Sequence, residues 1–199
     1  MADAVVLRPD PGSIPEDLKK SSGWWGTLFL VATEAAVFAY LLFSYYYMAI
    51  ANHSVWPADA PSLKLALPNT IILLISSVAI WWADRQHTAG RMTEAMAGVA
   101  IAAGLGVVFL GVQLLEWHNK TFTLSSDPYG SLYFTITGFH MAHVIVGLVI
   151  MATLILWLAL GLLSDRRNSA VSIAAIYWHF VDAVWLAVFF TFYITPYLS

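Results

Sequence analysis

The side chains of this sequence that could do chemistry are a few carboxylates and imidazoles inside long apolar stretches. A charged group at the centre of a bilayer costs about 2.5–3.5 kcal/mol even on the gentlest scale, so such residues mark functional positions by default. His140 and His143 are three residues apart, as are His179 and Asp182, and this spacing places each pair on one face of a helix. A helix bundle could therefore gather several of these groups in its interior. The full set is Glu34, Glu116, His140, His143, His179 and Asp182, with Trp178 beside His179.

Three chemistries fit these residue types, and proton handling is a further alternative. Histidines with nearby carboxylates could hold a metal ion, although the Glu-x-x-His pairs of di-iron bundles do not occur in this sequence. A haem could be ligated between His140 or His143 and His179. The third interpretation, which residue chemistry favours for the histidines and Asp182, is hydrogen bonding between helices, at about 0.6 kcal/mol per contact. The absence of cysteine excludes thiolate metal sites and iron–sulfur clusters.

Glu34 differs from the other ionisable residues because Thr33 is its only polar neighbour along the first apolar stretch. A protonated carboxyl in a membrane could handle protons or react with hydrophobic carbodiimides. Alternatively, it could hydrogen-bond a neighbouring helix and do nothing else. The residue types leave both interpretations open.

Two stripes of small residues point to close helix packing. Gly98, Ala102 and Gly106 are spaced by four, and so are Gly138 and Ala142. Small residues at this spacing let the backbones of membrane helices approach each other. We therefore expect both stripes to lie at contacts between helices.

The composition indicates the elements that must position these groups. Of the 199 residues, 60% are hydrophobic and 11% charged, against roughly 25% charged residues in soluble domains. This balance excludes a soluble globule, and the apolar content excludes disorder. The apolar runs are continuous and long enough for helical spans of about 20 residues, whereas membrane strands would alternate in polarity. We expect an all-α membrane protein with a polar cytoplasmic tail at 1–23, not a cleaved leader, and five spans at about 24–50, 65–83, 94–116, 131–163 and 170–195.

The basic residues predict an orientation for these five spans. The N-terminal tail and the second and fourth loops carry seven of them, and the first and third loops carry two. Because basic residues are enriched on the cytoplasmic side, this distribution places the N-terminus inside and the C-terminus outside. The inner arginines of the loops, Arg85, Arg91, Arg166 and Arg167, could meet lipid phosphates. The seven inner residues are Arg8, Lys19, Lys20 and these four arginines, and the two outer ones are Lys64 and Lys120.

Several motifs together resemble subunit III of the haem–copper respiratory oxidases over nearly the whole chain, from about Trp24 to Tyr193. Met141-Ala142 departs from the Gly-Leu that many members have, and five spans match the shorter bacterial form instead of the seven-span mitochondrial one. The matching segments are Ala32-Thr33-Glu34-Ala35-Ala36, Gln113, Glu116-Trp117, Tyr129-Gly130-Ser131, Thr137-Gly138-Phe139-His140, His143-Val144, Gly147, Tyr177-Trp178-His179-Phe180-Val181-Asp182 and Val184-Trp185.

The resemblance implies a subunit that carries no haem, copper or other cofactor, and that packs against subunit I and also contacts subunit II, which hold the redox centres. It implies a V of two helices against three, with phospholipids in the cleft and Glu34 as the buried, carbodiimide-reactive carboxyl beside it. It implies support for proton uptake and for the lifetime of the complex. The remaining polar residues would be structural: Glu116, His140, His143, Trp178, His179 and Asp182.

We therefore predict a non-catalytic subunit of a cytochrome c oxidase-type complex in a bacterial inner membrane, acting in aerobic respiration. Alternatives within the same type of complex are a quinol oxidase subunit III and an accessory subunit of a nitric oxide reductase. The alternative from another class is a free-standing b-type cytochrome with a haem between His143 and His179.

Overall fold

The computed structural model describes residues 22–52, 56, 61–163 and 169–197, and this part of the chain is helical, with no strand. All five helices are long and apolar enough to cross a membrane, which confirms the predicted class. Residues 1–21 of the predicted tail, together with Arg166 and Arg167, lie outside the described residues. The helices are α1 (Ser22–Ala51), α2 (Leu63–Thr88), α3 (Met92–His118), α4 (Pro128–Ala159) and α5 (Ala170–Phe189), which continues as a π-helix (Phe190–Ile194) and a 3-10 turn (Thr195–Tyr197).

Local capping explains why α2 and α4 start earlier than hydropathy alone predicts. The Asp127 side chain accepts a hydrogen bond from the Gly130 N–H at 2.6 Å, and Pro128 follows it in the first turn, so α4 begins at 128 instead of 131. Ser62 caps α2 in a similar way, and Pro68 therefore lies in the second turn of that helix. Gly90, with φ 79°, makes the tight turn that joins α2 to α3.

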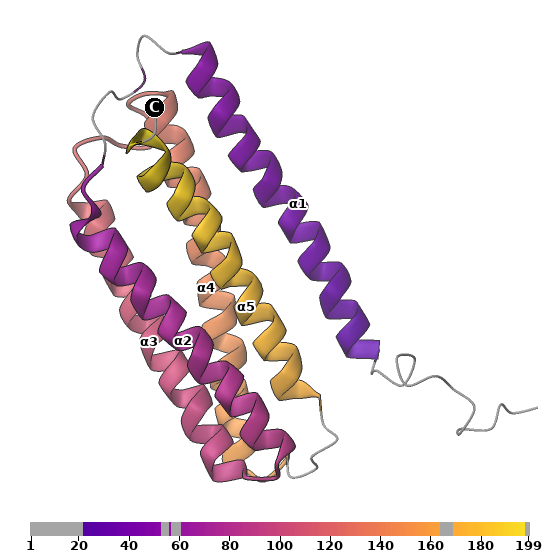
Figure 1. Ribbon diagram of the computed structural model, residues 1–199. Coiled ribbons are helices and arrows are strands. Elements are labelled where there is room, and N and C mark those ends of the chain that lie inside the picture. The colour runs from indigo at the N-terminus through magenta and orange to yellow at the C-terminus, as the bar shows by residue number, and fades with distance from the viewer. Residues whose placement is uncertain (1–21, 53–55, 57–60, 164–168, 198–199) are drawn as a thin grey trace, which may run out of the picture.

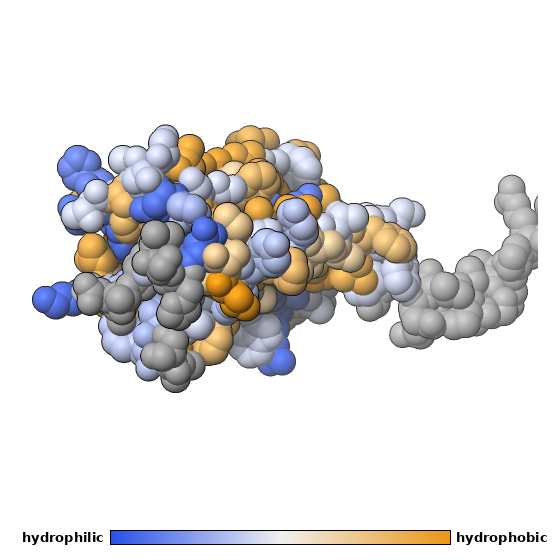
Figure 2. All heavy atoms as spheres, turned by 90° about the horizontal axis from the view of Figure 1, so that it is seen from above, coloured by the Kyte–Doolittle hydropathy of each residue, from blue (hydrophilic) through white to orange (hydrophobic). Residues whose placement is uncertain are grey.

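Helices α2 to α5 pack together as a four-helix group, and α1 lies to one side of it against α4 and α5 (Figure 1). The expected V of two helices against three is therefore wrong, because α2 packs most extensively on α3 and also on α5. Figure 2 looks onto the end of the bundle that carries the C-terminus, where strongly hydrophilic residues gather over the four-helix group and few lie over α1. We call this end the C-terminal end, and the opposite one the α2–α3 end.

The small-residue stripe of α3 explains how α2 joins this group. A Cβ atom on Gly98 would lie 2.8 Å from the Cβ of Ala83 on α2, so the two helices touch almost backbone to backbone. Gly106 on α3 and Gly147 on α4 together accommodate the ring of Trp178 from α5. The prediction for α3 is confirmed.

The second predicted stripe, on α4, does not bring helix backbones together. Ala142 is exposed, and Gly138 meets only the ring of Trp117 at ordinary contact distance. The close approach on α4 occurs at Gly147 instead, because that residue faces the large ring of α5.

Candidate functional site

Glu34 and His143 form a hydrogen-bonded pair between α1 and α4. The distance from Glu34 Oε2 to His143 Nε2 is 3.2 Å, and His143 Nδ1 lies 2.7 Å from the carbonyl oxygen of Phe139. A carbonyl can only accept, so Nδ1 carries a hydrogen. The Nε2 atom of a neutral imidazole then accepts a hydrogen bond from a protonated Glu34, and that of a protonated imidazole donates one to the Glu34 carboxylate. The pair can therefore hold one proton in two positions along a single hydrogen bond.

This pair lies at the edge of the bundle and not in its core. In the chain itself 32% of the Glu34 side chain is exposed and 15% of that of His143, so the carboxyl that we expected to be buried is half-buried. The ring of Phe38 covers His143 at a centroid distance of 5.1 Å. Tyr177 of α5 donates its hydroxyl to the His143 carbonyl oxygen at 3.3 Å. Three helices, α1, α4 and α5, thus meet at this pair.

An apolar groove of about 410 Å³ lies between the same three helices, and it is closer than the Glu34–His143 pair to the α2–α3 end of the bundle. Leu30 and Thr27 of α1 line it one and two turns before Glu34, and Tyr177 borders it on α5. The α4 wall includes Thr153 and Trp157. A nearly apolar groove between membrane helices suits the hydrocarbon chain of a ligand.

His140 has an environment quite different from that of His143, although we expected the two on one face. It is fully buried in the four-helix group, with ring centroids 5.0 Å from Trp185 and 5.9 Å from Phe109. Neither ring nitrogen has a partner among the described residues. Residues three apart on a helix differ by about 60° in direction, and this rotation is enough to turn His143 toward α1 and His140 into the core.

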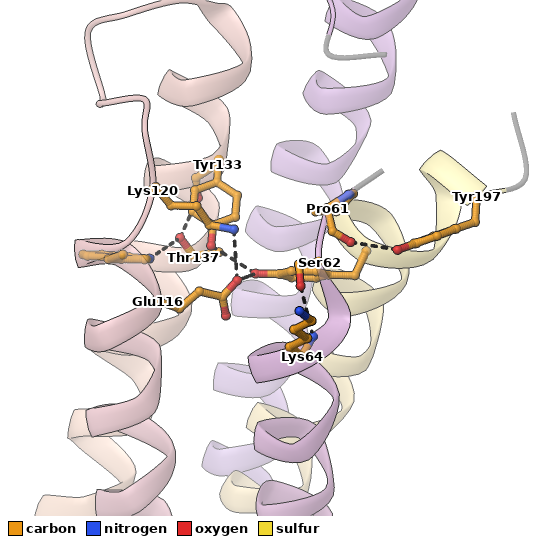
Figure 3. Close-up of polar contacts among 10 residues, drawn as sticks. Pro61, Ser62, Lys64, Glu116, Lys120, Tyr133, Thr137 and Tyr197 are labelled. Carbon is orange, nitrogen blue, oxygen red and sulfur yellow. Dashed lines mark hydrogen bonds and ion pairs between the residues drawn. The ribbon is translucent and has the colours of Figure 1, made fainter. Parts of the chain in front are cut away.

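Glu116 belongs to a separate cluster at the C-terminal end (Figure 3). Lys120 Nζ lies 3.0 Å from its carboxylate, and the Tyr193 hydroxyl donates to the same oxygen. The hydroxyls of Tyr133 and Tyr193 are 3.0 Å apart, and the Lys120 ammonium lies over both rings. Beside them Trp117 Nε1 donates to Thr137 Oγ1 at 3.2 Å. This cluster joins α3, α4 and α5, and its arrangement is that of a structural clamp.

A ladder of polar contacts connects α2 to α5 along most of their length. Sequence analysis missed the α2 partners because single hydroxyl residues are common in membrane helices, and the adjacent pair Ser76-Ser77 was their only signal. Of the α5 residues in the ladder, Trp178, His179 and Trp185 belong to the motifs named above, and Ser172 does not. The four contacts are Thr70–Trp185 (2.9 Å), Ser76–Trp178 (2.9 Å), Ser77–His179 (2.7 Å) and Asp84–Ser172 (2.5 Å).

The polar residues that we predicted as one network thus occupy several places. Only His179 and Asp182 remain close, with Nδ1 and Oδ2 3.9 Å apart. The described residues contain no group of three or more His, Asp or Glu side chains that could hold a metal ion. The two histidines considered as haem ligands, His143 and His179, have different partners, Glu34 and Ser77.

The two described arginines of the predicted inner side lie at the turn between α2 and α3. The Arg85 guanidinium lies 4.2 Å from the ring centre of Trp81. Arg91 Nη1 donates to Gln86 Oε1 at 3.4 Å. Both side chains belong to exposed residues, so a lipid phosphate could reach them.

Comparison with known proteins agrees with the sequence motifs. The family described as cytochrome c oxidase subunit III matches residues 18–197. Cytochrome c oxidase subunit 3 of Ornithorhynchus anatinus is 32% identical over 177 residues, which cover 85% of this chain and 68% of the relative. The proteins of the same name from Prototheca wickerhamii and Triticum aestivum are 33% and 31% identical, with 85% of this chain and 68% and 67% of each relative covered.

Proposed function

We propose, from the premise that this chain belongs to the cytochrome c oxidase subunit III family, that it serves a proton-pumping terminal oxidase of the cytochrome c oxidase type. The chain is a multi-pass membrane protein and a subunit III of a haem–copper oxidase complex in a respiratory chain. In our proposal subunit I is its main contact, subunit II is a further neighbour, and haem and copper belong to those partners. We propose the bacterial inner membrane as its location.

The role that we propose is to bind phospholipid and to support proton uptake and the stability of subunit I, with no catalytic step in this chain. The observation that carries this proposal is the Glu34–His143 hydrogen bond at the end of the apolar groove. The pair provides a proton donor and a proton acceptor in one hydrogen bond at the edge of the bundle. An acyl chain in the groove would hold a lipid headgroup at the α2–α3 end, where Arg85 and Arg91 lie.

The experiment that tests this role compares the intact complex with Glu34→Ala and Glu34→Gln variants. We expect the initial rate of oxygen consumption to change little and the number of turnovers before inactivation to fall several-fold. Both variants lose the ionisable proton, and Glu34→Gln keeps the hydrogen bond to His143. The matched control is Glu94→Gln, an exposed carboxylate in the first turn of α3. Equal lifetimes for wild type and both Glu34 variants would contradict the role.

Two measurements separate the alternative functions. Oxidation of cytochrome c or of quinol by the purified complex distinguishes the two oxidase types, and reduction of nitric oxide would identify the third. An absorption spectrum of the purified chain tests the free-standing cytochrome. A Soret band that shifts reversibly on reduction and is lost in His179→Ala would contradict a subunit without a redox centre.

A further inference from the structure

We propose that the exposed face of α5 around His179 is the contact surface for a transmembrane helix of another oxidase subunit, which presents a hydrogen-bonding group to the His179 ring. This inference rests on the proposed function, since it requires a multi-subunit complex. It assigns the contact to one face of this chain, the side of α5 that lies between α1 and α2 in Figure 1.

The depth of His179 makes its exposure costly in lipid. The residue lies nine positions after Ala170, the start of α5, which is about 14 Å along the helix axis. The hydrocarbon core of a bilayer is about 30 Å thick, so the ring lies near its middle. In this chain 41% of the His179 side chain is exposed. A polar ring in such a position normally faces a protein or water instead of acyl chains.

The hydrogen-bonding groups around His179 are incompletely used. Its Nδ1 atom is bonded to Ser77 Oγ at 2.7 Å, which leaves Nε2 on the exposed side of the ring. Asp182, one turn further on, is buried with 4% of its surface exposed, and its Oδ2 atom lies 3.9 Å from His179 Nδ1, so this carboxyl faces the interior of the chain. Lipid tails offer no partner to the His179 Nε2 atom, whereas a neighbouring helix with Ser, Thr, Asn, Gln or Tyr does.

The surface next to His179 also has the shape that a close helix contact needs. Ala183 and Ala187 follow it at intervals of four residues, and both are exposed. Small residues at this interval permit two membrane helices to approach closely. Leu186 and Phe190, which are 42% and 50% exposed, lie on the same face of α5. An exposed polar ring and two small residues therefore coincide on one face.

The first test uses the absence of cysteine from this chain, which permits a single spin label on this chain, attached before the labelled chain is assembled into the complex. The label is attached at Ala183→Cys or, as a control, at Ile145→Cys. Ile145 is 48% exposed on α4, and it lies at a similar depth because the neighbouring Gly147 touches Trp178 of α5. We expect the label at position 183 to be immobile and shielded from dissolved oxygen, and the label at 145 to be mobile and accessible. A mobile, accessible label at 183 would mean a lipid-facing surface and would overturn the inference.

The second test measures how much of this chain remains in the purified complex. We expect Ala183→Trp and His179→Phe to be lost several-fold more readily in detergent than wild type, and His179→Asn and Ile145→Trp to remain bound. Asn keeps hydrogen-bonding capacity at position 179, so its retention distinguishes a polar contact from a packing defect. Full retention of Ala183→Trp and His179→Phe would overturn the inference and leave the proposed function intact.

Two further outcomes identify a wrong partner. If cross-linking through Ala183→Cys yields a dimer of this chain, the surface binds a second copy and the inference is overturned. If the wild-type chain itself does not purify with haem-containing subunits, the proposed function fails and this inference fails with it.

Discussion

The contact of α2 with α5 and the contact of α1 with α4 and α5 are built in different ways. Four polar contacts connect α2 and α5 from Thr70 to Asp84. Helix α1 buries only Phe38 and Tyr45, and its hydrogen bonds to the other helices are that of Glu34 near its middle and those of Tyr46 near the C-terminal end. The apolar groove lies beneath the part of α1 that contains Thr27 and Leu30.

This difference indicates a division of labour within one small chain. The contact between α2 and α5 makes the four-helix group a stable body, because two of its four hydrogen bonds, Thr70–Trp185 and Ser76–Trp178, are buried. Hydrogen bonds attach α1 to the other helices at Glu34 and at Tyr46, and the groove beside α1 leaves room for a ligand. We therefore expect substitutions in the first contact to change stability, and substitutions in the second to change lipid binding and lifetime.

The largest effect is expected for Trp178→Ala. The ring fills the space between Gly106 and Gly147 and donates to Ser76, so its removal leaves a cavity and an unused acceptor. We expect the free energy of unfolding to fall by about 3 kcal/mol, measured by SDS titration of the complex in detergent. The control is Trp157→Ala, whose ring is 41% exposed; an equal loss there would show that burial in the four-helix group is not the cause.

The double variant Thr70→Val and Ser76→Ala is expected to have the next largest effect. It removes the acceptors of Trp185 and Trp178 and leaves two buried indole N–H groups unpaired. We expect a loss of about 2 kcal/mol in the same titration. In the matched control, Thr153→Val, the lost hydroxyl bonds only the Val149 carbonyl of its own helix. A double variant as stable as the control would show that the ladder does not hold α2 in place.

A smaller effect is expected for Tyr46→Phe at the C-terminal end of α1. The hydroxyl lies 3.2 Å from Thr191 Oγ1 and 3.3 Å from Thr195 Oγ1. Because both distances are long and Tyr46 itself is exposed, the loss should be about 0.6 kcal/mol. Repeated unfolding titrations can resolve such a difference, and Tyr40→Phe, with a 69% exposed side chain, is the control. A loss as large as that of the double variant would remove the contrast between the two contacts.

The smallest effect on stability is expected for Leu30→Trp, which places a large ring in the groove. We expect the free energy of unfolding to stay within about 0.5 kcal/mol of wild type, while the phospholipid that copurifies with the complex decreases. Mass spectrometry of extracted lipid provides this measurement, and Phe29→Trp on the exposed side of α1 is the control. Unchanged lipid content would show that the groove holds no lipid.

Much of the fold could be predicted from the sequence because it depends on local properties. The continuous apolar runs predicted all five helices, and the error at the start of α4 came from its cap, Asp127. The stripe from Gly98 to Gly106 was correctly assigned to helix contacts. The expected grouping of the helices was wrong, because grouping depends on contacts between residues of different helices. Examples are Gly98 with Ala83 and Gly147 with Trp178.

The sequence by itself determined that this chain spans a membrane with five helices, and which few ionisable residues lie within the spans, since hydropathy and spacing are properties of each segment alone. Only the tertiary structure decided that Glu34 meets His143, that His140 is enclosed by Trp185 and Phe109, and that His179 stays exposed beside Ser77. The physical reason is that a partner on another helix depends on the rotation and vertical position of both helices. Those are set by close packing between residues far apart in the chain.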